Sequence, residues 1–504
     1  MARETVGVAA AVTDWAGAET VVVAGHANIA GTPLTADHLL QIGSISKSFA
    51  AICALQLGRE GVLSLDDELT EHLPWFRVGG GHGPIRLRHL LMHRSGLPAG
   101  SEAGPSSVAH VADLAGAETL WEPGTRFWYS NVGYDALGLA LERRAGLPFP
   151  ELVRRRILQP LGMHASSAHI AAGHRASLAD GHERVAQDRP PYRSMLLETA
   201  PFVESEAASG SVLSTAGDMA AYVRLLLGRG AEGMLDPADF DQMTDGLPDD
   251  EGTPYGLGLS ITGTEGHTVV GHTGSMVGYR ANMLCDLDSG VGAVALVNGP
   301  KGARVLAEYA LALARAAREG TALPDPPPDP QPDLVPYTGR YGPFTVTDSG
   351  IAGSGFDGGL EELGRDVFST DHPELSETLV RFGRTNGRVD HLMAGDDWYP
   401  AEGYLGPAEF RHPPEWAAHP SLYRSHNPWL PACRVTLCRG ELAVEEESYG
   451  RIPLAPRSAG GFLWATPEGP LPEVFRFDTL VDGRSQRLDW NGCVFYRAMQ
   501  VQAG

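Results

Sequence analysis

The segment QIGSISKSFAAICALQLG, residues 41–58, has the composition of a buried helix, except that it contains one charged side chain, Lys47. Ser44 and Lys47 are three positions apart, so on a helix they lie on the same face. A serine hydroxyl becomes a good nucleophile when a base takes its proton, and an amine in an apolar setting near a helix N-terminus has its pKa lowered toward neutrality. The spacing therefore predicts a nucleophile and its base. The alternative is a structural lysine whose stem packs in the core while its ammonium extends to water.

The composition limits what the protein can be. With 504 residues the chain is too long for one hydrophobic core and should form two or three domains. Its net charge of −23 would repel nucleic-acid phosphates and anionic membrane surfaces, and we find no basic patch that offsets this charge. No stretch approaches the ~18 apolar residues of a membrane span. We therefore expect neither a nucleic-acid partner nor a membrane partner.

The N-terminus and the cysteines bear on the cellular compartment. Residues 1–15, MARETVGVAAAVTDW, have a glutamate where a secretory signal carries basic residues, and their apolar run is short. The five cysteines are an odd number without a C-x-x-C pair, which is not the pattern of a disulfide framework. We expect an opening β-strand, free thiols and a cytoplasmic protein.

A proline-rich segment, TALPDPPPDPQPDLVP at residues 321–336, divides the chain. Its seven prolines exclude a helix or a central strand, so we expect an extended linker. Residues 1–320 have strand-like runs at both ends and most helical patterns between them. This order predicts an α+β domain whose terminal segments share one antiparallel sheet.

The region after the linker consists of short strands and turns. Residues 380–392 resemble residues 475–488, since each has an Arg-Phe strand followed by an Asn-Gly or Asp-Gly turn. This repeat predicts two β domains, 337–412 and 413–504, each a small barrel or half-barrel of a lipocalin-like kind. Whether they cover a catalytic site, dock on the first domain or mediate dimerisation is left open by the sequence.

Two further segments carry chemistry. PGTRFWYSNVGYDALG places Tyr129 and Asn131 in an aromatic-rich turn before a helix. A phenol there can shuttle protons, and an amide can hold an acyl carbonyl or order the lysine. HTVVGHTGSM places His272 and Gly274 on a strand, where a glycine lets a substrate lie against the strand and the next backbone N–H can point at a developing oxyanion.

Taken in order, S-x-x-K at 44–47, Y-x-N at 129–131 and H-T-G at 272–274 resemble the motifs of the penicillin-binding-protein and class C β-lactamase family of serine hydrolases. The resemblance implies an α+β catalytic domain of this type, with an antiparallel sheet and a helical region, followed by the lipocalin-like β-barrel region. The resemblance also implies that the catalytic domain needs no cofactor and no metal. HLLMH at 89–93 lacks the glutamate of H-E-x-x-H, so we expect ordinary core there instead of a zinc site.

The resemblance also implies a role for each site residue. Ser44 would be the nucleophile, and Lys47 and Tyr129 would share the general base and acid work. The substrate-binding set would be Asn131, His272, Gly274 and Ser275, with the backbone N–H groups of Ser44 and Ser275 forming the oxyanion hole.

One departure from the family pattern narrows the function. Many members have lysine at the position of His272, where it helps to bind the carboxylate of penicillins and D-Ala-D-Ala peptides. A neutral imidazole binds an anion weakly at pH 7, so β-lactam hydrolysis and cell-wall carboxypeptidation are disfavoured. H-x-G variants resemble D-aminopeptidases, esterases and peptide-cyclising thioesterases.

We therefore expect a serine hydrolase that forms an acyl-enzyme on a small amide, ester or D-amino-acid peptide. The alternatives are an acyl transferase or macrocyclase with the same site, and an inactive ligand-binding homologue. The expected partner is a small molecule or short peptide, and a homodimer remains open.

Overall fold

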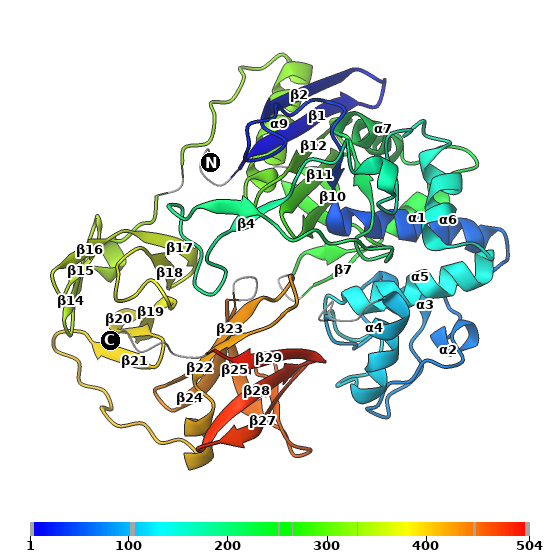
Figure 1. The fold of residues 1–504 in the computed structure, drawn as a ribbon. Coiled ribbons are helices and arrows are strands. Elements are labelled where there is room, and N and C mark those ends of the chain that lie inside the picture. Colours follow the sequence, from blue (N-terminus) through cyan, green and yellow to red (C-terminus); the bar gives the residue numbers. More distant parts are fainter. Residues whose placement is uncertain are drawn as a thin grey trace. The chain divides into compact units, whose positions relative to one another are not determined.

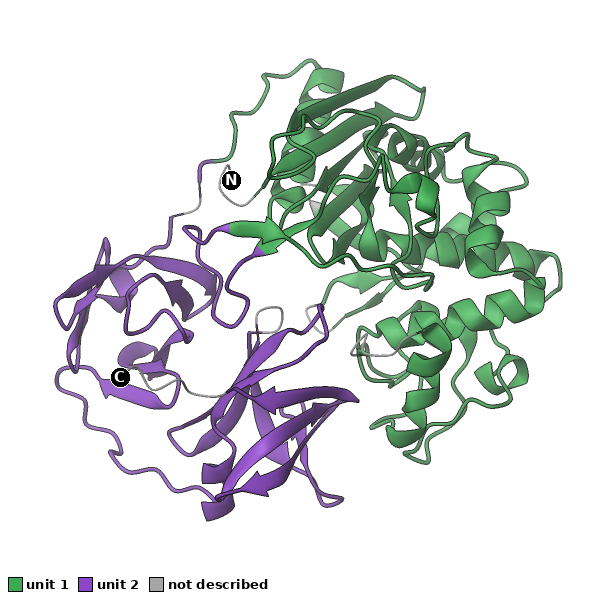
Figure 2. Cartoon of the chain, in the orientation of Figure 1, with its two compact units in different colours: residues 1–183, 197–327 green, residues 184–196, 328–504 purple. Residues whose placement is uncertain are grey.

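The protein is described by a computed structural model that covers residues 5–100, 106–249, 252–264, 266–329, 331–446 and 450–498. The chain separates into two compact units (Figure 2). The first unit contains residues 1–183 and 197–327, and the second contains residues 184–196 and 328–504. The first unit thus ends within the proline-rich segment, and a short insertion after residue 183 belongs with the β-rich second unit.

The first unit is built on an eight-stranded antiparallel sheet with the order β2-β1-β12-β11-β10-β9-β8-β7 (Figure 1). Strands from the two ends of the unit, β1 and β12, lie side by side in this sheet, with Val8 opposite Val297. This arrangement confirms the predicted α+β fold. The strands are β1 (Gly7–Asp14), β2 (Glu19–Gly25), β7 (Leu247–Pro248), β8 (Pro254–Tyr255), β9 (Ser260–Thr264), β10 (His267–Met276), β11 (Tyr279–Asp286) and β12 (Val291–Val297).

Helices cover both faces of this sheet, which explains why every residue of β12 is buried. On one face Leu311 of α9 packs with Ala293 and Val291. On the other face a Cβ at Gly292 would lie 2.4 Å from the Val223 side chain of α7. The helices are α1 (Ser46–Arg59), α2 (Leu69–His72), α3 (Leu87–Leu91), α4 (Ser107–Asp113), α5 (Asn131–Ala145), α6 (Phe149–Val153), α7 (Ala216–Leu227), α8 (Pro237–Thr244) and α9 (Ala303–Glu319).

Helix α1 is the buried helix that the sequence predicts. Every residue from Ser46 to Leu57 is buried, so the helix is enclosed on all sides and has no polar face. A short turn of 3-10 helix, η1 (Gly43–Ile45), leads directly into it. Two small ribbons are also present: β3 (Leu40–Gln41) with β6 (Leu213–Ser214), and β4 (His182–Arg184) with β5 (Leu197–Thr199), where the insertion after residue 183 begins and ends.

The second unit contains three β structures. A four-stranded sheet and a five-stranded sheet are followed by a closed barrel of eight strands. The strands of the two sheets are β13 (Gly339–Tyr341), β14 (Phe344–Thr347), β15 (Gly350–Gly353), β16 (Phe356–Gly358), β17 (Leu360–Gly364), β18 (Val367–Thr370), β19 (Val380–Thr385), β20 (Arg388–Ala394) and β21 (Asp397–Pro400). Those of the barrel are β22 (Ser421–Arg424), β23 (Ala432–Cys438), β24 (Glu441–Glu446), β25 (Gly450–Pro456), β26 (Phe462–Trp464), β27 (Leu471–Val481), β28 (Arg484–Trp490) and β29 (Cys493–Arg497).

The two repeated sequences form hairpins, β19–β20 and β27–β28. In each turn both central residues have positive φ: Asn386 and Gly387 in the first, Asp482 and Gly483 in the second. Asn-Gly and Asp-Gly are favoured in such turns because these residues tolerate positive φ and the turn matches the twist of the strands. The barrel core is packed with aromatic side chains, among them Phe475, Trp490 and Phe495.

The five cysteines are all free, as the sequence predicts, and each of them is buried. Among the described residues, no helix combines the length and the apolar character needed to cross a membrane.

Candidate active site

The nucleophile candidate lies where η1 meets α1. Ser44 is half-buried, whereas Lys47, in the first turn of α1, is completely buried. The side chains meet as the spacing predicts, because Lys47 Nζ lies 2.9 Å from Ser44 Oγ.

The buried amine of Lys47 has two further partners. Its Nζ lies 2.8 Å from Asn131 Oδ1 and 2.7 Å from the backbone carbonyl oxygen of Ser209. Both oxygens can only accept a hydrogen bond. When the lysine is neutral, its two N–H groups satisfy these two acceptors and its lone pair is left to face the hydroxyl of Ser44. The geometry is therefore that of a base aimed at a nucleophile.

The second motif meets the first at this amine. Helix α5 begins at Asn131 because Ser130 is its N-cap and accepts a hydrogen bond from the backbone N–H of Gly133. The cap leaves Tyr129 just before the helix, with its ring centroid 4.9 Å from Lys47 Nζ. Tyr129 and Asn131 are half-buried, so both lie at the accessible side of the site.

The third motif approaches the serine through backbone instead of side chains. A Cβ at Gly274 would lie 1.9 Å from the carbonyl oxygen of Ile42, and a Cβ at Gly43 would lie 2.6 Å from the backbone nitrogen of Ser275. Gly43 also has a φ of 52°, which disfavours other residues. Two glycines thus allow β10 to lie directly against the turn that carries Ser44.

His272 lies beneath this surface and is engaged at both ring nitrogens. Its Nε2 is 2.9 Å from the Tyr255 hydroxyl, and its Nδ1 is 2.5 Å from the carbonyl oxygen of Thr273. Burial and the nearby Lys47 lower the pKa of His272 to about 4, although the bond to Thr273 opposes them. His272 is therefore neutral at pH 7.

His93 belongs to none of the three motifs, and the sequence predicts ordinary core at its position. This histidine is fully buried, and its Nδ1 accepts a hydrogen bond of 3.0 Å from the backbone N–H of Ser130. Its ring lies 4.0 Å from that of Tyr129, centroid to centroid. Burial, followed by Lys47 and His272, holds the pKa of His93 well below its ordinary value. His93 is therefore neutral at pH 7, and its ring packs against that of Tyr129.

The carbonyl of Ser209 was also missed, and no signal in the sequence could have identified it. A backbone oxygen is present at every residue, so only the fold shows which one reaches the lysine. The contacts of His93 with Ser130 and Tyr129 are likewise visible only in the structure.

One group of side chains in the described residues has metal-ligand character, namely His267, Asp286 and Asp288. It lies at the end of β10 remote from Gly274. Asp286 pairs with His267 and with Arg315, so its carboxylate already has cationic and hydrogen-bonding partners. These contacts are those of a structural ion-pair group.

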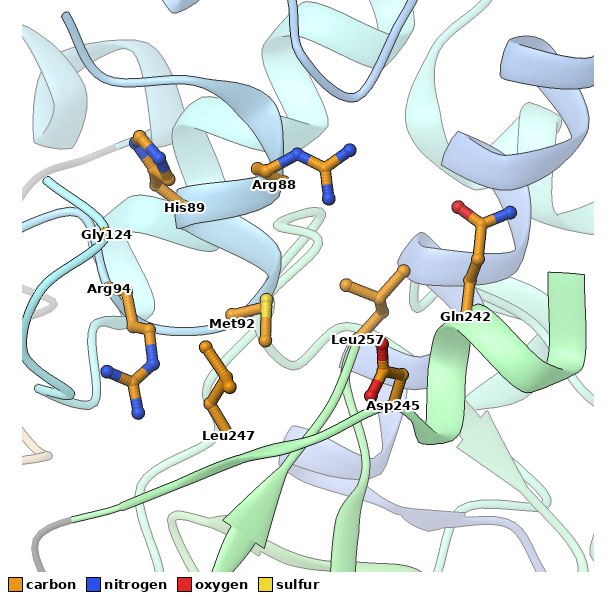
Figure 3. Close-up of a pocket in the computed structure, with 9 residues that line it drawn as sticks. All are labelled: Arg88, His89, Met92, Arg94, Gly124, Gln242, Asp245, Leu247 and Leu257. Atoms are coloured by element: carbon orange, nitrogen blue, oxygen red, sulfur yellow. The ribbon is translucent and has the colours of Figure 1, made fainter.

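A pocket of about 310 Å³ opens elsewhere in the first unit (Figure 3). None of its lining residues belongs to the three motifs. They are Arg88, His89, Met92, Arg94, Gly124, Gln242, Asp245, Leu247 and Leu257. The pocket lies near the first motif, because Gly258, which follows the lining residue Leu257, packs against the backbone carbonyl of Lys47.

Comparison with known proteins defines the class. Residues 1–318 match the family described as Beta-lactamase, and the chain belongs to this family. It is similar to human putative beta-lactamase-like 1, with 28% identity over 407 residues, 73% of this chain and 78% of that protein. It is also similar to esterase EstB from Burkholderia gladioli, with 32% identity over 155 residues, 27% of this chain and 39% of that protein.

Solved structures agree with this assignment. The octameric penicillin-binding protein homologue from Pyrococcus abyssi has the same fold, with a TM-score of 0.57, 23% identity, and coverage of 79% of this chain and 96% of that one. A D-stereospecific amidohydrolase from Streptomyces sp. matches with a TM-score of 0.50, 25% identity, and coverage of 59% and 90%. The resemblance inferred from the three motifs is confirmed, and the protein is a member of a hydrolase family.

The close approach at Gly274 can be tested by adding one methyl group. In Gly274→Ala the new Cβ would overlap the Ile42 carbonyl, so β10 and the serine turn must move apart. We expect the free energy of unfolding to fall by about 1–3 kcal/mol, as in other overpacked sites, and Ser44 to lose reactivity. Chemical denaturation measures the first effect. Gly263→Ala on β9 is the control, because its Cβ would be 4.0 Å from the His267 carbonyl and should fit. Equal stability of the two variants would contradict the packing argument.

Proposed function

We propose that the protein is a serine hydrolase that forms an acyl-enzyme at Ser44 from a small amide, ester or D-amino-acid peptide. The observation that carries this proposal is the environment of Lys47. Nζ lies within 2.9 Å of Ser44 Oγ and of two acceptor-only oxygens, so in the neutral amine those two oxygens take up the N–H groups and the lone pair faces Ser44. A lysine that served only the core would have no reason to be aimed at a half-exposed hydroxyl.

The acylation step follows from this geometry. As Ser44 Oγ attacks the substrate carbonyl carbon, its proton passes to Lys47 Nζ, and the carbonyl oxygen becomes an oxyanion. The backbone N–H groups of Ser44 and Ser275 are the proposed donors to this oxyanion. When the intermediate collapses, the C–N or C–O bond breaks and the leaving group takes the proton from Lys47, directly or through Tyr129.

Deacylation reverses these roles with water as the nucleophile. Lys47 and Tyr129 take a proton from water while its oxygen attacks the ester carbon, and Ser44 Oγ leaves with a proton. Asn131 holds Lys47 through Oδ1, and its amide nitrogen is the proposed donor to the acyl group. If an amine replaces water, the same acyl-enzyme gives an amide, so the products distinguish hydrolysis from acyl transfer.

The comparisons support the substrate class in outline. An esterase and a D-stereospecific amidohydrolase are among the similar proteins whose names state an activity. Both names describe the cleavage of an acyl bond, which is the chemistry that Ser44 and Lys47 can perform.

The nucleophile is tested by labelling. Ser44→Ala should abolish turnover of an activated ester, because no other group carries the acyl intermediate. Intact-mass analysis with a fluorophosphonate should give one adduct, located on the peptide that contains Ser44. Ser64→Ala, which removes an exposed serine hydroxyl of the same unit, should leave labelling unchanged. An adduct on another serine with Ser44 unmodified would refute the assignment.

The base is tested by a double-mutant cycle. Lys47→Met keeps the buried stem without the amine, and Tyr129→Phe keeps the ring that packs on His93. Each change should lower kcat by about 10²–10⁴, the usual contribution of general acid–base catalysis. The double variant should lose far less than the product of the two losses, because the groups act as one unit. Losses that multiply would mean that the two residues act independently.

The neutral state of His272 predicts poor activity on penicillins. With a pKa of about 4, the imidazole is uncharged above about pH 5 and offers no cation to a carboxylate. The unaltered protein should therefore turn over benzylpenicillin slowly or not at all, whereas His272→Lys should improve acylation by carboxylate-bearing substrates and weaken it for neutral ones. Steady-state kinetics checks both. Efficient penicillin hydrolysis by the unaltered protein would contradict this prediction.

A further inference from the structure

Tyr255, the last residue of β8, fixes the state of His272. The carbonyl oxygen of Thr273 can only accept a hydrogen bond, so His272 Nδ1 carries the ring proton. His272 Nε2 then has only a lone pair, and the Tyr255 hydroxyl at 2.9 Å must donate to it. With both nitrogens used inside the protein, the imidazole keeps no N–H group for a substrate.

His272 lies beside Tyr129, the residue proposed to serve the leaving group. Tyr129 is the group proposed to return a proton to the leaving atom, and its ring lies 6.3 Å from that of His272, centroid to centroid. A leaving group that meets Tyr129 therefore lies next to the position that His272 and Tyr255 occupy together.

We propose that Tyr255 determines specificity for the leaving group, since its hydroxyl keeps His272 an acceptor and the site therefore selects uncharged leaving groups over those that carry a carboxylate. The inference rests on the proposed function and deepens it. It assigns the substrate class as amides or esters whose departing amine or alcohol bears no negative charge beside the scissile bond.

The charges around His272 support this assignment. The titratable groups around His272 and Tyr255 include Lys47 from α1, His93 after α3, Tyr129 before α5 and Tyr134 within α5. Tyr134 donates its own proton to the carbonyl of Leu91, and the Tyr255 proton points to His272 Nε2, because two lone pairs would otherwise face each other at 2.9 Å. Lys47 Nζ lies within hydrogen-bond distance of Ser44 Oγ, Asn131 Oδ1 and the carbonyl oxygen of Ser209. Burial holds the pKa of His93 well below its ordinary value and that of Tyr255 well above its own. Tyr255 therefore keeps its proton at neutral pH, so its hydroxyl remains a donor.

The test uses two aryl acetates that differ only in the leaving group, methyl 4-acetoxybenzoate and 4-acetoxybenzoate. Both give the same acetyl-enzyme, so any difference in kcat/KM arises in acylation. The quantity to compare is the ratio of kcat/KM for the neutral ester to that for the anionic one. Comparing this ratio between variants cancels the intrinsic reactivity of the esters and the general repulsion by a chain of net charge −23.

Tyr255→Phe keeps the ring, which packs 5.0 Å from that of His93, and removes the donor. The pKa of His272 should rise, because the hydrogen bond that stabilised its neutral form is lost. The ratio should fall by about tenfold at pH 5, the value of one charge-assisted hydrogen bond, and by less at pH 8. NMR titration of the imidazole measures the pKa.

Tyr222→Phe is the matched control. It also removes a fully buried tyrosine hydroxyl, but this one donates to Ser48 Oγ at 2.7 Å instead of to His272, so the ratio should stay unchanged. An unchanged ratio in an active Tyr255→Phe protein would overturn the proposal.

The unaltered protein gives an independent check should Tyr255→Phe fail to fold. Nitrogen-15 shifts should identify His272 as the Nδ1–H tautomer, and the opposite tautomer would overturn the proposal. Absence of a Ser44 adduct with either ester would contradict the proposed function itself, which is a distinct result.

Discussion

A buried amine must find hydrogen-bond partners, and the site is organised around this requirement of Lys47. An isolated charge or an unsatisfied N–H in the core costs several kcal/mol, so the surrounding chain must supply acceptors. The partners come from three distant parts of the sequence: the acceptors Asn131 Oδ1 and the Ser209 carbonyl, and the hydroxyl of Ser44. Satisfying the lysine therefore brings together the elements that the proposed reaction needs.

The sheet brings backbone to the serine where a side chain would not fit. Gly274 and Gly43 remove the two Cβ atoms that would separate β10 from the serine turn. Because the hairpin of β10 and β11 is paired along its whole length, the approach is rigid. Preorganised N–H groups are effective for an oxyanion because they need no rearrangement during the reaction.

Neutral rings lie near Lys47 on the buried side of the site. His93 and His272 lose affinity for a proton through burial and through the neighbouring lysine, while burial keeps Tyr255 protonated. These rings can shape and orient the site without adding charge. Substitution of a histidine for the lysine common in the family thus changes the electrostatics of the site as well as its shape.

The sequence by itself determined the class of protein. The lone lysine in an apolar helix, the glycine-containing strand and the Asn-Gly and Asp-Gly turns are local patterns, since propensity and spacing express them within a few residues. Tertiary structure decided what lies between distant segments: the Ser209 carbonyl on Lys47, His93 beneath Tyr129, Tyr255 on His272, and the placing of residues 184–196 with the second unit. These contacts depend on backbone atoms, positive φ angles and long-range packing, none of which leaves a mark on the order of residue types along the chain.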